Sequence, residues 1–149
     1  MNEEQTQDKQ NLSGEAADLL KLYLINEEDI TALRGYGKLV LPKMETFIER
    51  FYVWLKPQPE YDEFFADDET LSRVQQLSRN YWQEFFTHEL NADYLVKRRY
   101  IGEVHARIGL PLPIYLAAMN KACTLFSTDL YDGSLNGEEY LAAVRAIQK

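Results

Sequence analysis

The stretch Gly102-Glu-Val-His-Ala-Arg-Ile-Gly-Leu-Pro111 contains a histidine that a helical pattern turns toward the protein interior. His105 follows Ile101 by four residues and precedes Ile108 by three, and these spacings put all three side chains near one face of a helix. Gly102 lies one turn earlier, where a missing side chain would let a flat group approach the helix. The closing Gly-Leu-Pro ends the helix. A histidine in this setting is either a hydrogen-bonded core residue or a ligand.

The first half of the chain has the spacing of helices. Residues 15–26 follow the helical repeat, and residues 26–29 provide a polar break and an N-terminal cap for a second helix that runs to about residues 35–37. Pro42 starts or kinks a third helix that ends at residues 56–59. Its apolar stripe consists of Met44, Phe47, Ile48, Phe51, Tyr52 and Leu55.

Helical spacing continues in the second half. Asp67-Asp-Glu-Thr70 opens a helix with acidic residues that suit its N-terminal dipole, and the next helix runs from about residue 92 to the break at 109–111. Further helices are expected from the region of Pro113 to about residue 131 and over residues 138–149. The face predicted to be buried in the helix after Asp67 consists of Leu71, Val74, Leu77, Tyr81 and Phe85.

No stretch alternates like a strand between hairpin turns, so the sequence predicts an all-α domain. Helices of unequal length, broken by proline and glycine, favour a globin-like fold over an up-and-down bundle. Because the helix expected over residues 15–26 precedes the helices of a globin, we expect a globin-like fold with an additional N-terminal helix. Residues 1–14 are predicted to be a flexible lead-in and residues 15–149 a single domain. The last helix has no stop signal, and we expect it to continue into a further domain.

Composition narrows the function classes. The chain has 149 residues, 46% of them hydrophobic and 13% aromatic, which is enough for one well-packed core. A net charge of -8 at pH 7 argues against nucleic acid and anionic membranes as partners, because like charges repel. No apolar run reaches the roughly 18 residues of a membrane span, and Cys123 has no second cysteine to pair with. We therefore expect a cytoplasmic protein.

Motifs of common enzyme classes are missing from the sequence. It contains no glycine-rich phosphate loop, no G-x-S-x-G, no H-E-x-x-H and no cysteine pair for zinc. The other histidine, His88, is predicted to lie at a helix end, where a solvated histidine facing the helix dipole is the usual explanation. This fragment is therefore not expected to be an enzyme.

The segment from Gly102 to Pro111, with Tyr115 after it, resembles the proximal-histidine segment of the globin-coupled sensors. The run Phe47-Ile-Glu-Arg-Phe-Tyr52 resembles the distal helix of that family, and Gln83-Glu-Phe-Phe86 and Tyr94-Leu-Val-Lys-Arg-Arg99 also fit its pattern. The similarity covers roughly residues 28–131. It therefore extends over most of the chain.

The resemblance implies haem b with His105 as the proximal iron ligand, and no C-x-x-C-H motif for covalent attachment is present. The face of the iron opposite His105 would be open and would bind O2, CO or NO. Tyr52 matches the tyrosine that donates a hydrogen bond to O2 in the family, although packing with a hydroxyl bound to backbone or water is the alternative. Val74 and Leu77 match ligand-facing positions that are polar in some relatives and apolar here, while Gln75, Gln76 and Ser78 adjoin them.

The same resemblance implies a haem pocket lined by aromatic and aliphatic side chains. Tyr115 would lie behind His105 and orient it, with simple packing as the alternative. The residues predicted to line the pocket are Phe47, Phe51, Phe65, Tyr81, Ile101, Ile108 and Tyr115.

For the whole protein, the resemblance implies an O2 sensor that regulates a covalently attached output domain. Within the family, the segment Glu103-Val-His-Ala-Arg107 most closely resembles the sequences of the diguanylate cyclases. Family members commonly form homodimers through their last two helices, here about residues 112–131 and 138–149. Two alternatives remain: a globin-shaped sensory or interaction module without haem, of the stressosome type, and a redox enzyme such as an NO dioxygenase.

Overall fold

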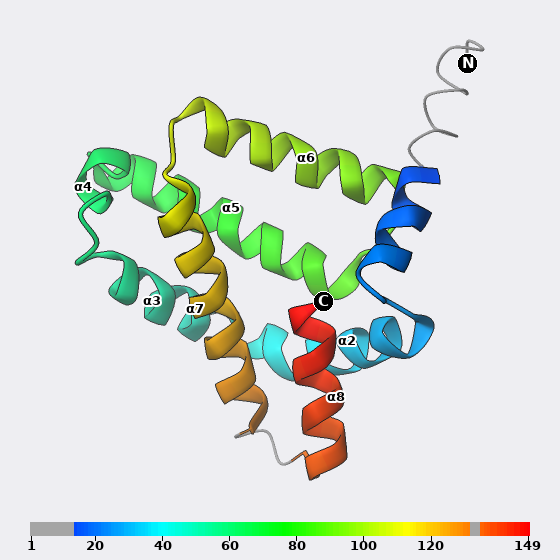
Figure 1. Cartoon of the computed structure of the whole chain (residues 1–149). Coiled ribbons are helices and arrows are strands. Elements are labelled where there is room, and N and C mark those ends of the chain that lie inside the picture. The colour runs from blue at the N-terminus through cyan, green and yellow to red at the C-terminus, as the bar shows by residue number, and fades with distance from the viewer. Residues whose placement is uncertain (1–13, 132–134) are drawn as a thin grey trace.

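Helices form all the regular structure in the computed structural model, which describes residues 14–131 and 135–149. Residues 14–22 form an N-terminal helical segment. The next elements are α2 (Glu27–Val40), a 3-10 turn η1 (Leu41–Lys43), α3 (Met44–Leu55) and the short α4 (Tyr61–Phe64). The chain continues with α5 (Asp68–Thr87), α6 (Ala92–Arg107), α7 (Leu112–Tyr131) and α8 (Gly137–Gln148), as Figure 1 shows. The prediction of an all-α fold with an extra N-terminal helix is confirmed.

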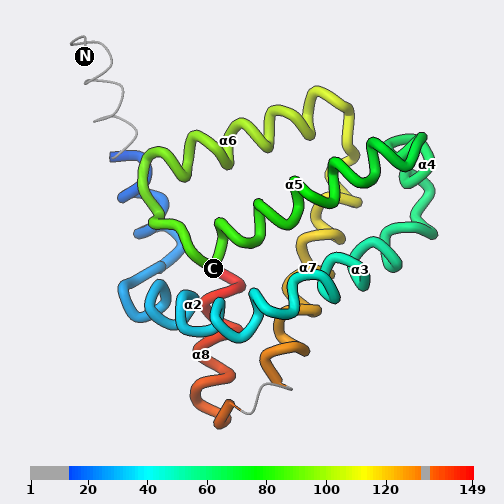
Figure 2. Tube along the Cα trace, turned by 180° about the vertical axis from the view of Figure 1, so that it is seen from behind, coloured from blue at the N-terminus to red at the C-terminus, as the bar shows by residue number. Residues whose placement is uncertain are grey.

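Two groups of helices make up the fold. In Figures 1 and 2, α5 and α6 lie side by side, and α7 passes close to the end of this pair that is nearer to α4. On the other side α2 packs along α8, where the Tyr36 hydroxyl donates a hydrogen bond to the Glu139 carbonyl oxygen. Lys149 Nζ also binds Asp29 Oδ2 at 2.8 Å.

Aromatic rings from three helices form the centre of the core. Phe47 of α3 and Phe126 of α7 are fully buried and stack with ring centroids 4.1 Å apart and planes 8° from parallel. Trp82 and Phe86 of α5 contact Phe126 edge to face, at 5.0 Å and 5.1 Å between centroids. Such pairs add about 0.5–1.5 kcal/mol each beyond their area burial. They hold α3, α5 and α7 in one arrangement.

Most helix starts agree with the sequence signals. Asn26 caps α2, and its side chain accepts from the Asp29 amide while Asp29 binds the Asn26 amide in return. Asp67 caps α5 by accepting from the Thr70 amide. The predicted lead-in, residues 1–14, lies outside the described residues except for Gly14, which is helical.

Three predictions about helix faces and ends were wrong. Helix α2 does not stop at residues 35–37 but continues to Val40, because Gly37 is buried inside it against Phe86. Leu77 is 57% exposed, since the face of α5 that packs on the core carries Trp82 and Phe86 instead.

The third wrong prediction concerns the end of α6. Ile108 was predicted to lie on the inner face with His105. It forms the C-cap of the helix and is 50% exposed, because the regular turn ends at Arg107 and the last residue before the break turns outward.

Among the described residues, no helix combines the length and the apolar character that crossing a membrane requires.

Gly37 offers a test of the packing between α2 and α5. A Cβ atom added there would lie 2.9 Å from Phe86 Cβ, whereas one at Gly35 would meet no atom within 4 Å. Gly37→Ala should lower the free energy of unfolding by about 1–3 kcal/mol through overpacking. The matched control Gly35→Ala should raise it by about 0.5–1 kcal/mol through helix propensity. Urea denaturation measures both, and equal effects at the two sites would contradict the packing.

Candidate functional site

His105 lies on the half-buried inner face of α6. No residue of this helix is fully buried, so its inner face is not enclosed by the core of the protein. The Nδ1 atom of His105 is buried and has no hydrogen-bond partner in the described structure. Burial lowers the pKa of the imidazole below its ordinary value, because a charged ring is disfavoured away from water. The ring is therefore held neutral at pH 7, the state in which imidazole binds metals.

Tyr115 is the aromatic neighbour of His105. Their ring centroids lie 5.5 Å apart at 56° between the planes, and Tyr115 is half buried on α7. The two rings are therefore neighbours, and the role of Tyr115 in orienting His105 stays a prediction. Gly102, one turn before His105, is exposed, and a Cβ there would meet no atom of the described chain within 4 Å. Packing within the protein therefore does not explain that glycine.

Tyr52 lies on α3, facing α5. It is 7% exposed, and its hydroxyl lies 3.1 Å from Ser78 Oγ. The ring packs edge to face against Phe51 and Phe65, at 5.6 Å and 5.9 Å between centroids. Burial raises the pKa of the phenol above its ordinary value, and the Ser78 hydrogen bond offsets part of that shift. Tyr52 thus stays protonated and can donate a hydrogen bond.

Ser78 is a site residue that sequence reasoning did not select. Val74, the predicted ligand-facing residue, is half buried, and Ser78 follows it by four residues on the same helix face. The signal that could have found it was this spacing, but an isolated serine in a helix is usually a surface residue. Leu77 is 57% exposed, and its assignment as a ligand-facing residue stays a prediction. The polar atom beside Tyr52 therefore comes from Ser78.

The other residues predicted to line the pocket have different environments. Phe47 belongs to the fully buried core, and Phe51 stacks on it at 6.0 Å between centroids. Ile101 is half buried on α6, between the turns that carry Arg98 and His105. The structure brings two sets of residues together: Tyr52 with Phe51, Phe65 and Ser78, and His105 with Tyr115.

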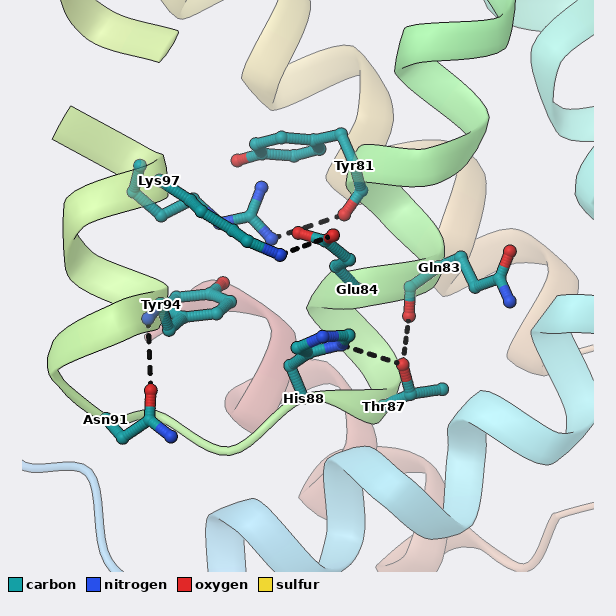
Figure 3. A network of polar contacts seen from close by, with 9 residues as sticks. Tyr81, Gln83, Glu84, Thr87, His88, Asn91, Tyr94 and Lys97 are labelled. Atoms are coloured by element: carbon teal, nitrogen blue, oxygen red, sulfur yellow. Dashed lines mark hydrogen bonds and ion pairs between the residues drawn. The ribbon is translucent and has the colours of Figure 1, made fainter. Parts of the chain in front are cut away.

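Tyr81 is placed where α5 faces α6. Burial raises its pKa to about 12, so its hydroxyl is neutral at pH 7. Figure 3 shows Tyr81 from α5 and Tyr94 from α6 in the polar network that joins the two helices, where Lys97 Nζ binds Glu84 Oε1 at 2.9 Å. Arg98 also belongs to this contact, because its Nη2 donates to the Tyr81 carbonyl oxygen at 3.3 Å.

The second histidine lies outside these groups. His88 is the exposed C-cap of α5, and its Nδ1 lies 3.4 Å from Thr87 Oγ1 (Figure 3). This position confirms the prediction of a solvated residue at a helix end. Cys123 is half buried on α7, and burial raises the pKa of its thiol.

Comparison with known proteins identifies a family and a similar solved structure. A family model described as Protoglobin matches residues 12–149. Among solved structures, the chain is similar to the globin domain of a globin-coupled sensor from Geobacter sulfurreducens, with a TM-score of 0.82 and 23% sequence identity. That match covers 89% of this chain and 87% of the other. The match confirms the predicted globin-like fold.

Proposed function

Because the chain belongs to the protoglobin family, we propose that it is a haem-based gas sensor domain in which His105 holds haem b and O2 is the gas. The observation that carries this proposal is a pair of polar groups on two different helices, His105 on α6 and Tyr52 on α3. One is a neutral, half-buried imidazole with no protein partner at Nδ1, and the other is a buried phenol hydroxyl paired with Ser78. The proposal agrees with the fold of the sensor domain from Geobacter sulfurreducens.

The residues present fit a haem group. His105 supplies one neutral nitrogen ligand from a helix whose inner face the protein core leaves half exposed. Phe51, Phe65 and Tyr81 supply apolar and aromatic surface on the α3–α5 side, as a planar apolar cofactor requires. When bound, haem iron with a single histidine ligand supplies a position for a diatomic gas.

The protein side chains determine which gas is held and for how long. The protonated Tyr52 hydroxyl donates a hydrogen bond to a gas that accumulates negative charge, as O2 does more than CO. Ser78 holds that hydroxyl in place by the 3.1 Å contact. The rings of Phe51 and Phe65 exclude water, which would otherwise compete for the phenol. Tyr115 restrains the tilt of the His105 ring from behind.

Haem binding is tested by the two histidines of the chain. The purified protein mixed with haemin should show a Soret absorption band with a stoichiometry near one haem per chain. His105→Ala should lose the band or change its position, because the only nitrogen ligand is removed. His88→Ala, which changes an exposed histidine, is the matched control and should behave as wild type. A wild-type protein that does not bind haemin would favour the alternative, a globin-shaped sensory or interaction module without haem.

Oxygen specificity is tested at Tyr52. Tyr52→Phe should speed O2 dissociation about tenfold, because a lost hydrogen bond of about 1–1.5 kcal/mol corresponds to that factor. CO dissociation should change less. The control is Tyr36→Phe, which removes a hydroxyl that binds Glu139 on α8 instead. Stopped-flow absorbance measures the rates, and an O2 rate that Tyr52→Phe leaves unchanged would remove Tyr52 from the distal role.

We also propose that the signal leaves through a homodimer formed by α7 and α8. A groove of about 610 Å³ lies between these helices, lined by uncharged side chains that include Asn120, Tyr140 and Val144. Beside it, Leu112 and Leu116 are exposed on α7. In a chain of net charge -8, an uncharged surface is where a second copy can approach without repulsion. A shift of His105 and α6 on gas binding would change the packing of α7 through Tyr115.

Leu116 tests this interface. In analytical ultracentrifugation the wild-type protein should sediment as a dimer and Leu116→Glu as a monomer, because a charge would be buried between copies. Val53→Glu is the control, since Val53 is also an exposed apolar residue, 74% accessible, but lies on α3. A monomeric wild type, or equal dissociation by both variants, would overturn the interface.

The output belongs to the proposal as well. The sequence of residues 103–107 favours a diguanylate cyclase, attached after α8, as the output domain. Co-expression of the full-length protein with a reporter of cyclic dinucleotide would test it, and an unchanged dinucleotide level with or without O2 would argue against this output.

A further inference from the structure

Arg98 of α6 has an environment that neither the fold nor the proposed function uses. Its guanidinium lies between two tyrosine rings, 3.8 Å from the centroid of Tyr81 and 4.4 Å from that of Tyr94. Its Nη2 donates to the Tyr81 carbonyl oxygen at 3.3 Å. The Nε and Nη1 atoms are buried and have no hydrogen-bond partner in the described structure. Most of the donors of this cation are therefore removed from water and unsatisfied.

Arg98 has no ion-pair partner among the acidic residues that the structure describes, although the whole chain contains 24 acidic residues. Glu84, the carboxylate in the same network, binds Lys97, and that hydrogen bond is the main cause of its lowered pKa. Tyr81 is held neutral by its raised pKa of about 12. Guanidinium donors that are removed from water without a partner are costly, so an anion that accepts from Nε and Nη1 would be bound favourably.

The position of Arg98 relative to His105 indicates which anion Arg98 binds. Arg98 precedes His105 by seven residues, two helical turns, so both lie on the inner face of α6 about 10 Å apart along its axis. Ile101 fills the face between them and is half buried. A ligand that His105 binds at its centre can reach Arg98, about 10 Å away along the helix, if it carries a carboxylate at its edge. Haem b carries two propionate carboxylates on one edge of its ring.

We propose that Arg98 binds a haem propionate. This inference rests on the proposed function, because it requires haem on His105. The guanidinium is suited to the role, since Arg recognises carboxylates through charge-assisted hydrogen bonds from several donors. The Tyr81 and Tyr94 rings hold the guanidinium through cation–π contacts, and the Nε and Nη1 donors remain without a hydrogen-bond partner in the described structure.

The proposal is tested by comparing the rates at which the wild-type protein releases haem and haem dimethyl ester. Each ferric complex is mixed with excess apomyoglobin as acceptor, and the Soret change gives the rate of release. Haem dimethyl ester, which has no free propionate, should leave at least about tenfold faster than haem, as expected for a lost charge-assisted contact. Equal rates of release from wild type would overturn the proposal without any variant.

Arg98→Met assigns the effect to this residue. The variant should release haem at least about tenfold faster than wild type, and it should release haem and the dimethyl ester at similar rates. Arg98→Lys, which keeps the charge, should lie between the two. Arg99→Met is the matched control, because Arg99 is the next residue, pairs with Glu15 at the surface and is expected to leave haem release unchanged.

A purely structural role gives a different result. It predicts that haem dimethyl ester still leaves Arg98→Met faster than haem does, whereas the proposal predicts similar rates for the two ligands, because the residue that binds the propionate is removed. Persistence of the ester effect in Arg98→Met, or release no faster than from wild type, would overturn the proposal. A wild-type protein with no Soret band would instead mark failure of the haem proposal itself.

Discussion

The stack of Phe47 on Phe126 is the contact on which the arrangement of this protein depends. It joins α3 to α7 at the centre of the core, and Trp82 and Phe86 attach α5 to the same point. Tyr52 follows Phe47 by five residues on α3, so the orientation of that helix decides where its phenol points. Because α5 is fixed by Trp82, the Ser78 hydroxyl meets the phenol at hydrogen-bond distance. The position of the Tyr52–Ser78 pair is therefore a consequence of aromatic core packing.

Helix α6 is held in a different way. It has no fully buried residue, and its described links to neighbouring helices include two ion pairs, Lys97 with Glu84 and Arg99 with Glu15. Partly exposed ion pairs contribute little to stability, about 0–1 kcal/mol each. A helix attached in this way opens at low free-energy cost and responds to a ligand more readily than a core helix. This property suits a segment that carries the residue proposed to bind haem and that is proposed to pass its movement on to α7.

Sequence reasoning found the residues whose local pattern is distinctive. His105 stands out because a helical repeat turns it inward before a glycine-proline break, and Tyr52 because it continues the apolar stripe of α3. Ser78 was named only as a neighbour of Val74 and Leu77, because its importance depends on a partner 26 residues away. Arg98 lies in the run Lys97-Arg98-Arg99, which has the composition of a solvated surface. Only the packing of α6 against α5 separates the middle residue from its exposed neighbours.

The sequence by itself determined that the chain is helical, where most helices begin, and that His105 and Tyr52 are the candidate polar residues, because caps, proline breaks and apolar spacing are local properties. Tertiary structure alone decided which face of α5 is buried, so that Trp82 and Phe86 enter the core and Leu77 does not. It also decided that α2 continues through Gly37, since that glycine is needed for close approach to Phe86 and not for a turn. These outcomes depend on contacts between helices distant in sequence, which the spacing within one helix does not specify.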